Sequence, residues 1–163
     1  HDSMAAELGH VTINHDGRWT GLGRRGGLEA YVSSTGLKRT IFHLLAESME
    51  DTPFRDIAYN DLHGEYITQQ AEAGDPIALE ASERTGKILG QQLANFVAFS
   101  HPEAFFLLGG LAKSGKWIFE PTQKYLEEYL LPFYKGKVKL LPSGMTGKNA
   151  AILGAAALIW DEK

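Results

Sequence analysis

The sequence contains no cysteine. This absence excludes disulfide bonds, iron–sulfur clusters, thiolate zinc sites and a cysteine nucleophile. The sequence also lacks any apolar run that approaches the roughly 18 residues of a membrane span, and no signal peptide is visible. We therefore predict a protein without membrane contact.

An excess of basic residues is missing as well. The chain has 16 Lys and Arg against 20 Asp and Glu, a formal net charge of −4. Nucleic-acid-binding domains are usually basic, so this balance argues against direct contact with nucleic acid. Hydrophobic residues make up 44% of the 163 residues and charged residues 22%, which is typical of a globular domain. The length suits one domain, or one lobe of a larger protein.

The N-terminus has no initiator methionine at position 1, because the chain begins His1-Asp2-Ser3-Met4. The patterned sequence starts almost immediately afterwards. A processed or artificial end is one interpretation. We favour a second, in which the chain is the C-terminal piece of a longer protein, for reasons that the motifs supply below.

The hydrophobic pattern predicts helices that alternate with short strands. Two short runs around Asp16-Gly17 predict a β-hairpin over residues 9–20. A strand buried on both faces is predicted over residues 104–108, because this short apolar run is bounded by turn signals. A second strand is predicted over residues 137–141. Residues 51–64 are expected to be irregular. The predicted helices cover residues 28–34 with an end near Gly36, and residues 37–50, 65–73, 76–100, 118–131 and 149–160. This alternation predicts an α/β fold.

A glycine-dense segment, Gly21-Leu22-Gly23-Arg24-Arg25-Gly26-Gly27, must be a loop, because glycine is unfavourable inside helices and permissive at positive φ. It lacks the Gly-Lys-Ser/Thr ending of a P-loop. No βαβ unit surrounds it, so it is not a dinucleotide fingerprint either. Arg24 and Arg25 could bind an anion, but a solvated loop tip is the simpler interpretation.

Several polar residues could carry chemistry. Glu7 and His10 are three residues apart and could face one ligand, and Glu29 occupies the first turn of a predicted helix. Gly109-Gly110 follows a predicted buried strand, where a backbone can closely approach a ligand. Each signal is weak alone. His43, His63 and His101 have no ligand-type spacing, and we interpret them as structural.

Taken together, these segments resemble the ROK family of sugar kinases and sugar-responsive repressors. The family pattern is Glu-x-Gly-His, a spacer, and then Cys-x-Cys-Gly-x-x-Gly-Cys-x-Glu. Residues 7–10 and 20–29 fit this pattern without a gap. Residues 107–110 resemble the family's glycine pair, and residues 149–156 resemble its C-terminal helix, so the resemblance spans nearly the whole chain.

The resemblance implies an actin-like ATPase (ribonuclease H-like) fold of two lobes. Residues 1–163 would form the C-terminal lobe, with a mixed sheet, flanking helices and a sugar-binding loop region over residues 7–31. Glu7, His10 and Glu29 would bind hexose hydroxyls, since carboxylates and a neutral imidazole accept hydrogen bonds from them. Gly109 and Gly110 would adjoin the nucleotide of MgATP.

The sequence departs from the family pattern at the three cysteines, which in the family bind structural zinc together with the histidine. Thr20, Leu22 and Gly27 occupy their positions and supply no thiolate. We therefore expect no zinc, and we expect apolar packing of Leu22 to replace the lost anchor.

The family's catalytic aspartate, in an Asn-Asp motif, and its phosphate loop lie before the region covered here. Asn60-Asp61 comes too late in the order to replace that Asn-Asp motif. We therefore expect the chain to be part of a cytoplasmic, glucokinase-like hexose kinase that is inactive in isolation. It would form a homodimer through this lobe, without contacting nucleic acid itself. The first alternative is the effector-binding lobe of a sugar-responsive ROK transcriptional regulator, preceded by a helix-turn-helix. The second is a degenerate structural lobe, which the lost zinc ligands suggest.

Overall fold

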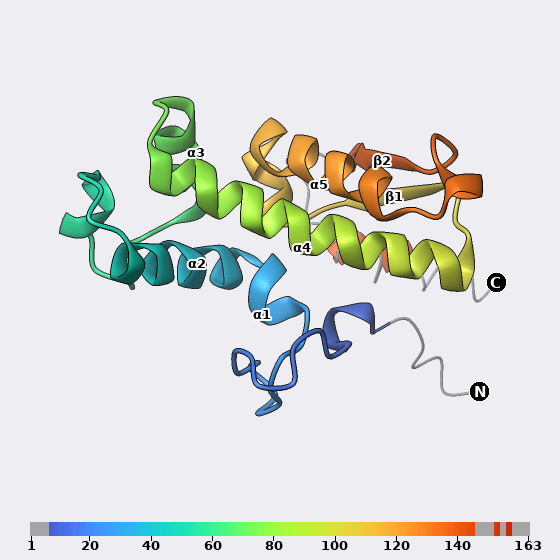
Figure 1. The fold of residues 1–163 in the computed structure, drawn as a ribbon, viewed down its shortest axis with the longest axis horizontal. Helices are drawn as coiled ribbons and strands as arrows, with labels where there is room; N and C mark the ends of the chain where they lie inside the picture. The colour runs from blue at the N-terminus through green and yellow to red at the C-terminus, as the bar shows by residue number, and fades with distance from the viewer. Residues whose placement is uncertain (1–6, 146–151, 154–155, 158–163) are drawn as a thin grey trace.

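The structure is a computed structural model that describes residues 7–145, 152–153 and 156–157. One long helix, α4 (Pro76–Ser100), runs through the molecule and separates two groups of elements (Figure 1). The first group contains α1 (Glu29–Val32) and α2 (Ser34–Glu47), and the second contains β1 (Ala104–Leu107), α5 (Lys116–Tyr129) and β2 (Lys139–Pro142). The remaining elements are η1 (Leu8–His10), η2 (Pro53–Asp56), α3 (Gly64–Glu72), η3 (Leu111–Ser114) and η4 (Pro132–Tyr134).

Helix α4 has the bounds predicted from the sequence. The Asp75 side chain caps its N-terminus by accepting a hydrogen bond from the Ala78 N–H at 2.9 Å, and Pro76 occupies the first turn. His101 ends the helix in a left-handed conformation with φ 43°. The sequence signals at the two ends of α4 were therefore sufficient to predict the bounds of this helix.

Two glycines let α4 and α5 approach each other closely. A Cβ on Gly86 would lie 2.7 Å from Cβ and Cγ of Pro121, which is inside α5. A Cβ on Gly90 would lie 2.5 Å from the carbonyl oxygen of Thr122. Small residues on one helix thus create the groove that the other helix fills.

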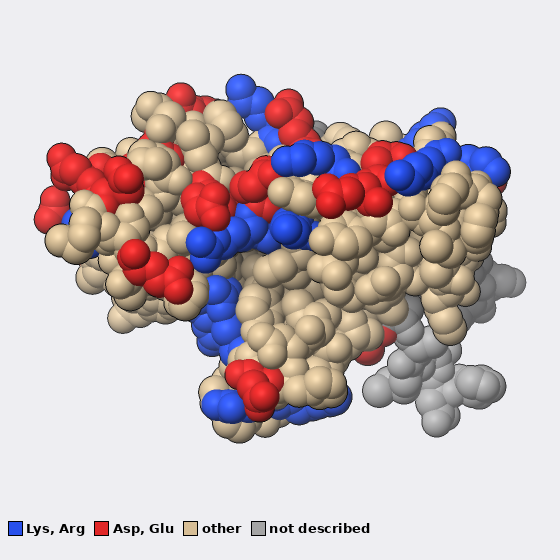
Figure 2. All heavy atoms as spheres, viewed as in Figure 1, with Lys and Arg blue, Asp and Glu red and all other residues tan. Residues whose placement is uncertain are grey.

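Charged residues of both signs are interspersed on the face formed by α3, α4 and α5 (Figure 2). Glu83 of α4 accepts hydrogen bonds from two residues of α5, Lys124 Nζ at 2.6 Å and the Tyr125 hydroxyl at 2.7 Å. Arg84 pairs with Glu80 at 2.7 Å. The mixture of signs agrees with the absence of a basic excess in the sequence.

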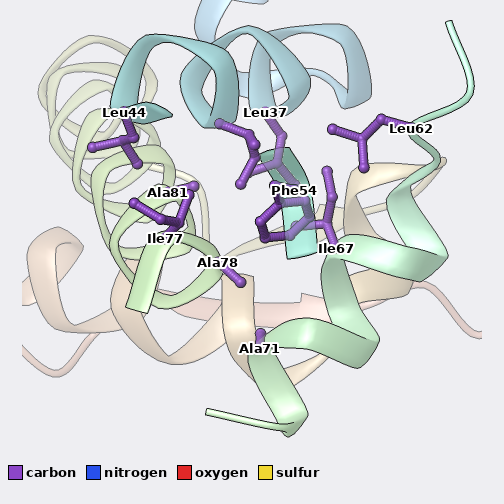
Figure 3. Close-up of a cluster of buried hydrophobic side chains, with 10 residues drawn as sticks. Leu37, Leu44, Phe54, Leu62, Ile67, Ala71, Ile77, Ala78 and Ala81 are labelled. Carbon is purple, nitrogen blue, oxygen red and sulfur yellow. The ribbon is translucent and has the colours of Figure 1, made fainter. Parts of the chain in front are cut away.

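The main hydrophobic core joins α2, α3 and α4 (Figure 3). Phe54 of η2 lies among these helices and is only 1% exposed. The Tyr66 ring packs edge-on against it, with centroids 5.8 Å apart. The buried members are Leu37, Ile41, Leu44, Phe54, Leu62, Ile67, Ala71, Ile77, Ala78 and Ala81. This core fixes the base on which α1 and the N-terminal loop rest.

The two described strands pair in parallel, with Phe105 opposite Leu140. The predicted mixed sheet is therefore represented in the described residues by a parallel pair. Phe105 and Leu107 pack against a cluster of buried apolar residues that includes Leu93 and Val97 of α4 and Leu126 of α5. Phe106 and Leu108, in contrast, are 61% and 62% exposed. The prediction that this strand is buried on both faces is thus wrong for the described part of the chain. Successive side chains alternate in direction, and the two helices cover one face.

The predicted hairpin over residues 9–20 is wrong in its pairing. The turn exists, since the Gly17 N–H donates to the Asn14 carbonyl at 3.0 Å. Residues 24–28, however, lie between the two expected strands and bond to both. The Ile13 N–H donates to the Gly26 carbonyl at 2.8 Å, and the Gly26 N–H donates to the Arg18 carbonyl at 2.8 Å. The tight turn at Gly23, with φ 71°, returns the chain and allows this arrangement.

We predicted that Gly36 ends a helix, but it lies in the first turn of α2. The Ser33 side chain caps α2 by accepting a hydrogen bond from the Gly36 N–H at 3.0 Å. Glycine is required there because a Cβ would lie 2.5 Å from the Tyr31 carbonyl carbon and oxygen. The glycine at position 36 therefore reflects a close approach between α1 and α2 rather than the end of a helix.

The other predicted helices agree with the structure to within three residues, as α2, α3 and α5. Of the helix predicted over residues 149–160, residues 152–153 and 156–157 are helical, and the others lie outside the described residues. No helix in the described ranges has both the length and the hydropathy needed to cross a membrane.

Candidate functional site

The structure brings together Glu7, His10 and Glu29, the three residues predicted to bind sugar. His10 lies between the two carboxylates: its Nε2 is 3.7 Å from Glu7 Oε2, and its Nδ1 is 3.9 Å from Glu29 Oε2. The side chains of Glu7, His10 and Glu29 are 75%, 30% and 53% exposed. The cluster therefore offers accessible hydrogen-bonding atoms on one small surface.

Backbone contacts explain why residues so far apart in sequence meet. The 3₁₀ turn η1 carries His10, and the Leu28 N–H donates to the Val11 carbonyl at 3.0 Å. That bond places the start of α1 beside η1. A Cβ on Gly9 would lie 3.8 Å from Glu29 Cβ, so Glu29 and Gly9 are close neighbours. Carboxylates and an imidazole in this arrangement can accept several hydrogen bonds from a polyol.

The residues at the family's zinc positions do not fit a metal. A Cβ on Gly27 would lie 2.8 Å from Thr20 Cγ2 and 4.0 Å from His10 Cα, so these three positions do converge. They offer only the imidazole as a usual zinc ligand. Within the described ranges, no group of three His, Cys, Asp or Glu side chains is arranged to hold a metal ion.

Leu22 does not provide the apolar anchor that we expected, because it is 68% exposed. The turn formed by residues 20–24 turns its side chain toward solvent. Thr20 instead closes this turn. Its hydroxyl donates to the Arg24 carbonyl at 3.1 Å and accepts from the Arg24 N–H at 3.2 Å, and the residue is only 9% exposed. Arg24 and Arg25 are exposed, as expected of a loop tip.

A cavity of about 570 Å³ lies beside the predicted nucleotide residue Gly110. One wall comes from α3 and the residue before it, and the other from the start of α2 and from η3. Its lining includes Ser34, His63, Glu65, Thr68, Gln69, Gly110, Lys113 and Ser114. This volume suits a small-molecule ligand.

Gly110 makes the closest approach at this cavity, because a Cβ there would lie 2.4 Å from Ser34 Oγ. Gly109 has φ 89° and an open space where a side chain would project. Lys113 contributes a cation to the lining, and in the described part of the chain no carboxylate lies within 4.0 Å of its ammonium. Thr68 donates to Ser114 at 3.1 Å and ties α3 to η3 across the cavity. The lining also contains two carboxylates, Glu65 and Glu72, so the cavity can accept a polar molecule.

The cluster of Glu7, His10 and Glu29 is connected to the cavity through α1. Glu29 begins α1, and Ser34, which contacts Gly110, begins α2. Five residues of chain span at most about 18 Å. The two candidate sites are thus neighbours on the same short segment, although their other residues come from distant parts of the sequence.

Most of the residues that line the cavity were not predicted from the sequence. We interpreted His63 as structural, and it lines the cavity; Ser34 and Lys113 were not singled out. No motif identifies them, because α3, η3 and the start of α2 meet only through tertiary packing. The one available signal was the glycine pair after a strand, which located Gly110.

A model of the ROK family matches residues 1–162. The chain belongs to the ROK family. Family membership agrees with the resemblance that the Glu-x-Gly-His segment and the glycine loop indicated, and it covers nearly all of the sequence.

ROK relatives include both enzymes and regulators. A glucokinase from Thermotoga maritima is 28% identical over 97% of this chain and 50% of its own length. A xylose repressor from Bacillus spizizenii is 26% identical over 96% of this chain and 37% of its own length. The chain thus spans about half the length of the glucokinase, and less of the repressor.

Among solved ROK structures, a Streptomyces griseus glucokinase in complex with glucose and AMPPNP superimposes with a TM-score of 0.80. It is 28% identical and matches 94% of this chain and 51% of its own. The chain therefore has the α/β fold of ROK sugar kinases, which is an actin-like ATPase fold.

Proposed function

We propose that this chain is the C-terminal lobe of an ATP-dependent hexose kinase of the glucokinase type. The observation that carries the proposal is the contact between Ser34 and Gly110. Because of this contact, the cavity lies beside the glycine pair and within five residues of Glu29, so one short segment adjoins both the cluster of Glu7, His10 and Glu29 and a polar cavity. Transfer of a phosphoryl group to a sugar requires both binding sites to be close together.

Glu7, His10 and Glu29 bind the hexose in this proposal. Each accepts hydrogen bonds from sugar hydroxyls. Because Glu7 and Glu29 lie on opposite sides of His10, the three residues together fix the orientation of the sugar ring. A site that is built to hydrogen-bond hydroxyls strongly rejects analogues that lack them, because its polar groups would then be left unpaired.

The cavity beside Gly110 takes the nucleotide of MgATP. Gly109 and Gly110 allow the ligand to approach the backbone, and Lys113 supplies a positive charge for phosphate oxygens. Mg²⁺ is usually held through substrate phosphates and one or two carboxylates, so it would arrive with ATP. Support comes from the nucleotide-bound Streptomyces griseus glucokinase, whose complex contains AMPPNP.

The general base is not among the proposed site residues of this chain. We expect it to be an aspartate of the preceding lobe, which would take the proton from the attacking hydroxyl while the γ-phosphate lies in line. Residues 1–163 alone should therefore bind without catalysing. We further propose that the parent protein acts in the cytoplasm as a homodimer formed through this lobe.

A second candidate function is a sugar-responsive transcriptional regulator. The observation that favours it is the xylose repressor, which matches 96% of this chain. In that case this lobe binds the effector sugar, and a separate helix-turn-helix contacts DNA. The coding sequence upstream of His1 distinguishes the two: an Asp-x-Gly phosphate loop and an Asn-Asp motif support the kinase, and a helix-turn-helix supports the regulator.

The sugar site is tested by titrating a panel of hexoses into the product of the complete reading frame by calorimetry. We expect binding of one hexose to weaken by about tenfold to about a hundredfold in Glu29→Gln, since a charge-assisted hydrogen bond contributes about 1.5–3 kcal/mol. Glu128→Gln, on the exposed side of α5, is the matched control and should bind normally. Equal affinity of both variants would contradict the role of Glu29.

A further inference from the structure

The side chain of Arg18 crosses from the N-terminal loop to the helices behind it. Its Nη1 is 3.0 Å from the Gly36 carbonyl oxygen, 3.0 Å from the Thr40 hydroxyl and 3.4 Å from the Ala30 carbonyl oxygen. Ala30 belongs to α1, and Gly36 and Thr40 belong to α2. One guanidinium group thus joins three segments: the loop, the sugar-proximal helix and the helix that leads to the core.

Tyr31 completes the attachment. The Arg18 backbone N–H donates to the Tyr31 hydroxyl at 3.0 Å, and the guanidinium carbon lies 4.7 Å from the centroid of the Tyr31 ring. Gly17 makes this approach possible, because a Cβ there would lie within 2.1 Å of the Tyr31 hydroxyl. The loop, the backbone of Arg18 and the ring of Tyr31 therefore form one packed unit.

The environment of Arg18 is unusual for a cation. It is partly buried, and among the described residues no carboxylate forms an ion pair with it. Its partners are carbonyl dipoles, a hydroxyl and an aromatic face. Burial lowers the pKa of Arg18, and the positive charge of Arg39 lowers it further, while Tyr31 and Tyr59 raise it. A cation held in such surroundings indicates a structural demand for the N–H donors of Nη1, which lies near all three oxygens.

That demand is clear at α1. This helix has only four residues, so its last carbonyl groups have no partner four residues further along the same helix. Ser33 is extended, and the Arg18 guanidinium reaches the Ala30 carbonyl, adjacent to Glu29. Such a short helix is marginal without tertiary support. The position of Glu29 therefore depends on what holds α1.

We propose that Arg18 is the positioning residue for Glu29, and that it holds the sugar-binding loop in place of a metal. The residues that converge beside His10 do not fit zinc, whereas the Arg18 contacts pass from the loop through α1 to α2. The part of this inference that concerns sugar affinity rests on the proposed hexose site; the part that concerns the loop does not.

The loop is tested by hydrogen exchange of the 163-residue chain, followed in peptides that cover residues 10–32. Arg18→Ala should lower protection at the Gly26 and Leu28 amides by at least about tenfold, because buried carbonyls lose their donor. Arg24→Ala, which removes an exposed arginine from the same loop, is the matched control. Peptides from α4 report whether the variant is folded. Excess EDTA should leave the wild-type protection unchanged, and a loss of protection in EDTA would overturn the proposal.

The action through Glu29 is tested by a double-mutant cycle in the product of the complete reading frame. Arg18→Ala should weaken hexose binding by about tenfold and leave nucleotide binding unchanged, and Arg18→Lys should recover only part of the loss, since lysine cannot stack a planar group on the Tyr31 ring. In a Glu29→Gln background, Arg18→Ala should add less than about twofold. If the double variant instead loses hexose affinity by the product of the two single-variant factors, Arg18 does not act through Glu29 and the positioning role is overturned.

The two ideas fail in different ways. If the wild-type protein binds no hexose, the proposed function fails, and the hydrogen-exchange comparison still decides whether Arg18 holds the loop. If hexose binds, and Arg18→Ala exchanges like Arg24→Ala and binds hexose like the wild type, the proposed function stands and the inference about Arg18 is wrong.

Discussion

A Cβ placed on Gly27 would lie 2.8 Å from the Cγ2 methyl group of Thr20. The two residues occupy positions that are cysteines in the family pattern, and here the Thr20 side chain fills the space between them. Its methyl group packs against Gly27, and its hydroxyl closes the turn onto Arg24. At these two positions the loop has close packing and local hydrogen bonds, and neither residue is a usual metal ligand.

Replacing Thr20 with valine should remove the hydroxyl and keep the methyl group. The Arg24 N–H and carbonyl would each lose a partner, so we expect the free energy of unfolding to fall by about 1 kcal/mol, the usual net value of such a bond. Urea denaturation measures the change. Thr12→Val, at an exposed position nearby, should change stability by less than about 0.5 kcal/mol. Equal effects of the two substitutions would show that the Thr20 hydroxyl contributes nothing special.

Gly109→Ala should affect both stability and nucleotide binding. The backbone at Gly109 has φ 89°, where a side chain costs about 1–2 kcal/mol. Relief of this strain would move the glycine pair, so we also expect weaker AMPPNP binding. Thermal unfolding with and without AMPPNP measures both effects. Gly144→Ala is the control, because its φ is not positive and nothing lies within 4 Å of the added Cβ. A normal nucleotide-induced rise in Tm for Gly109→Ala would contradict the role of this loop.

Gly90→Ala should destabilise the α4–α5 pair. The added Cβ would lie 2.5 Å from the Thr122 carbonyl oxygen and 2.7 Å from the Leu126 N, and both atoms belong to backbone that cannot simply rotate away. Overpacking of this kind costs about 1–3 kcal/mol, whereas glycine-to-alanine substitution in an open helix is stabilising. Gln91→Ala, at the next and exposed position of α4, is the control. Chemical denaturation should separate the two variants clearly; an increase in stability for Gly90→Ala would refute the close contact.

The Glu83 ion pair should make stability depend on pH in the acid range. Hydrogen bonds from Lys124 and then Tyr125 lower the pKa of Glu83 from its ordinary value of 4.5. A carboxyl group whose pKa is lowered by folding stabilises the folded state above 4.5, and this stabilisation is lost as the pH falls through the folded-state pKa. The Tm difference between wild type and Glu83→Gln should thus be small and constant from pH 6 to 8 and should shrink below about 4.5.

Added salt should reduce the same difference at neutral pH, because both side chains are accessible to solvent. Glu128→Gln, an exposed residue of α5, provides the comparison in both experiments. A difference that grows as the pH falls would contradict the assigned direction of the pKa shift.

Elements with local signals could be predicted from the sequence, and contacts between distant segments could not. Asp75-Pro76 fixed the start of α4, because capping depends on adjacent residues. Gly36 was misinterpreted as a helix end, because its reason is a contact with Tyr31 that only the folded chain creates. The predicted pairing of the hairpin was wrong because residues 11–13 form backbone hydrogen bonds with residues 24–28 and not with residues 18–20.

The proximity of Glu7, His10 and Glu29 could be predicted from the sequence, and the cavity could not. Glu7, His10 and Glu29 stand at spacings that a known motif records, and the structure places them together. Arg18 carries no motif, and its importance appears only from its contacts with Ala30, Gly36 and Thr40. Leu22 was expected to pack because it is apolar, but a tight turn exposes it.

The central claim is that this chain belongs to an enzyme that transfers phosphate from ATP to a hexose. The most direct test is a coupled assay of ADP release by the product of the complete reading frame, with a panel of hexoses and MgATP. We predict hexose-dependent ADP release that Glu29→Gln suppresses and Glu128→Gln does not. If every hexose leaves ADP release at the sugar-free rate, while a hexose alters the binding of the same protein to DNA, the kinase proposal is contradicted and the regulator takes its place.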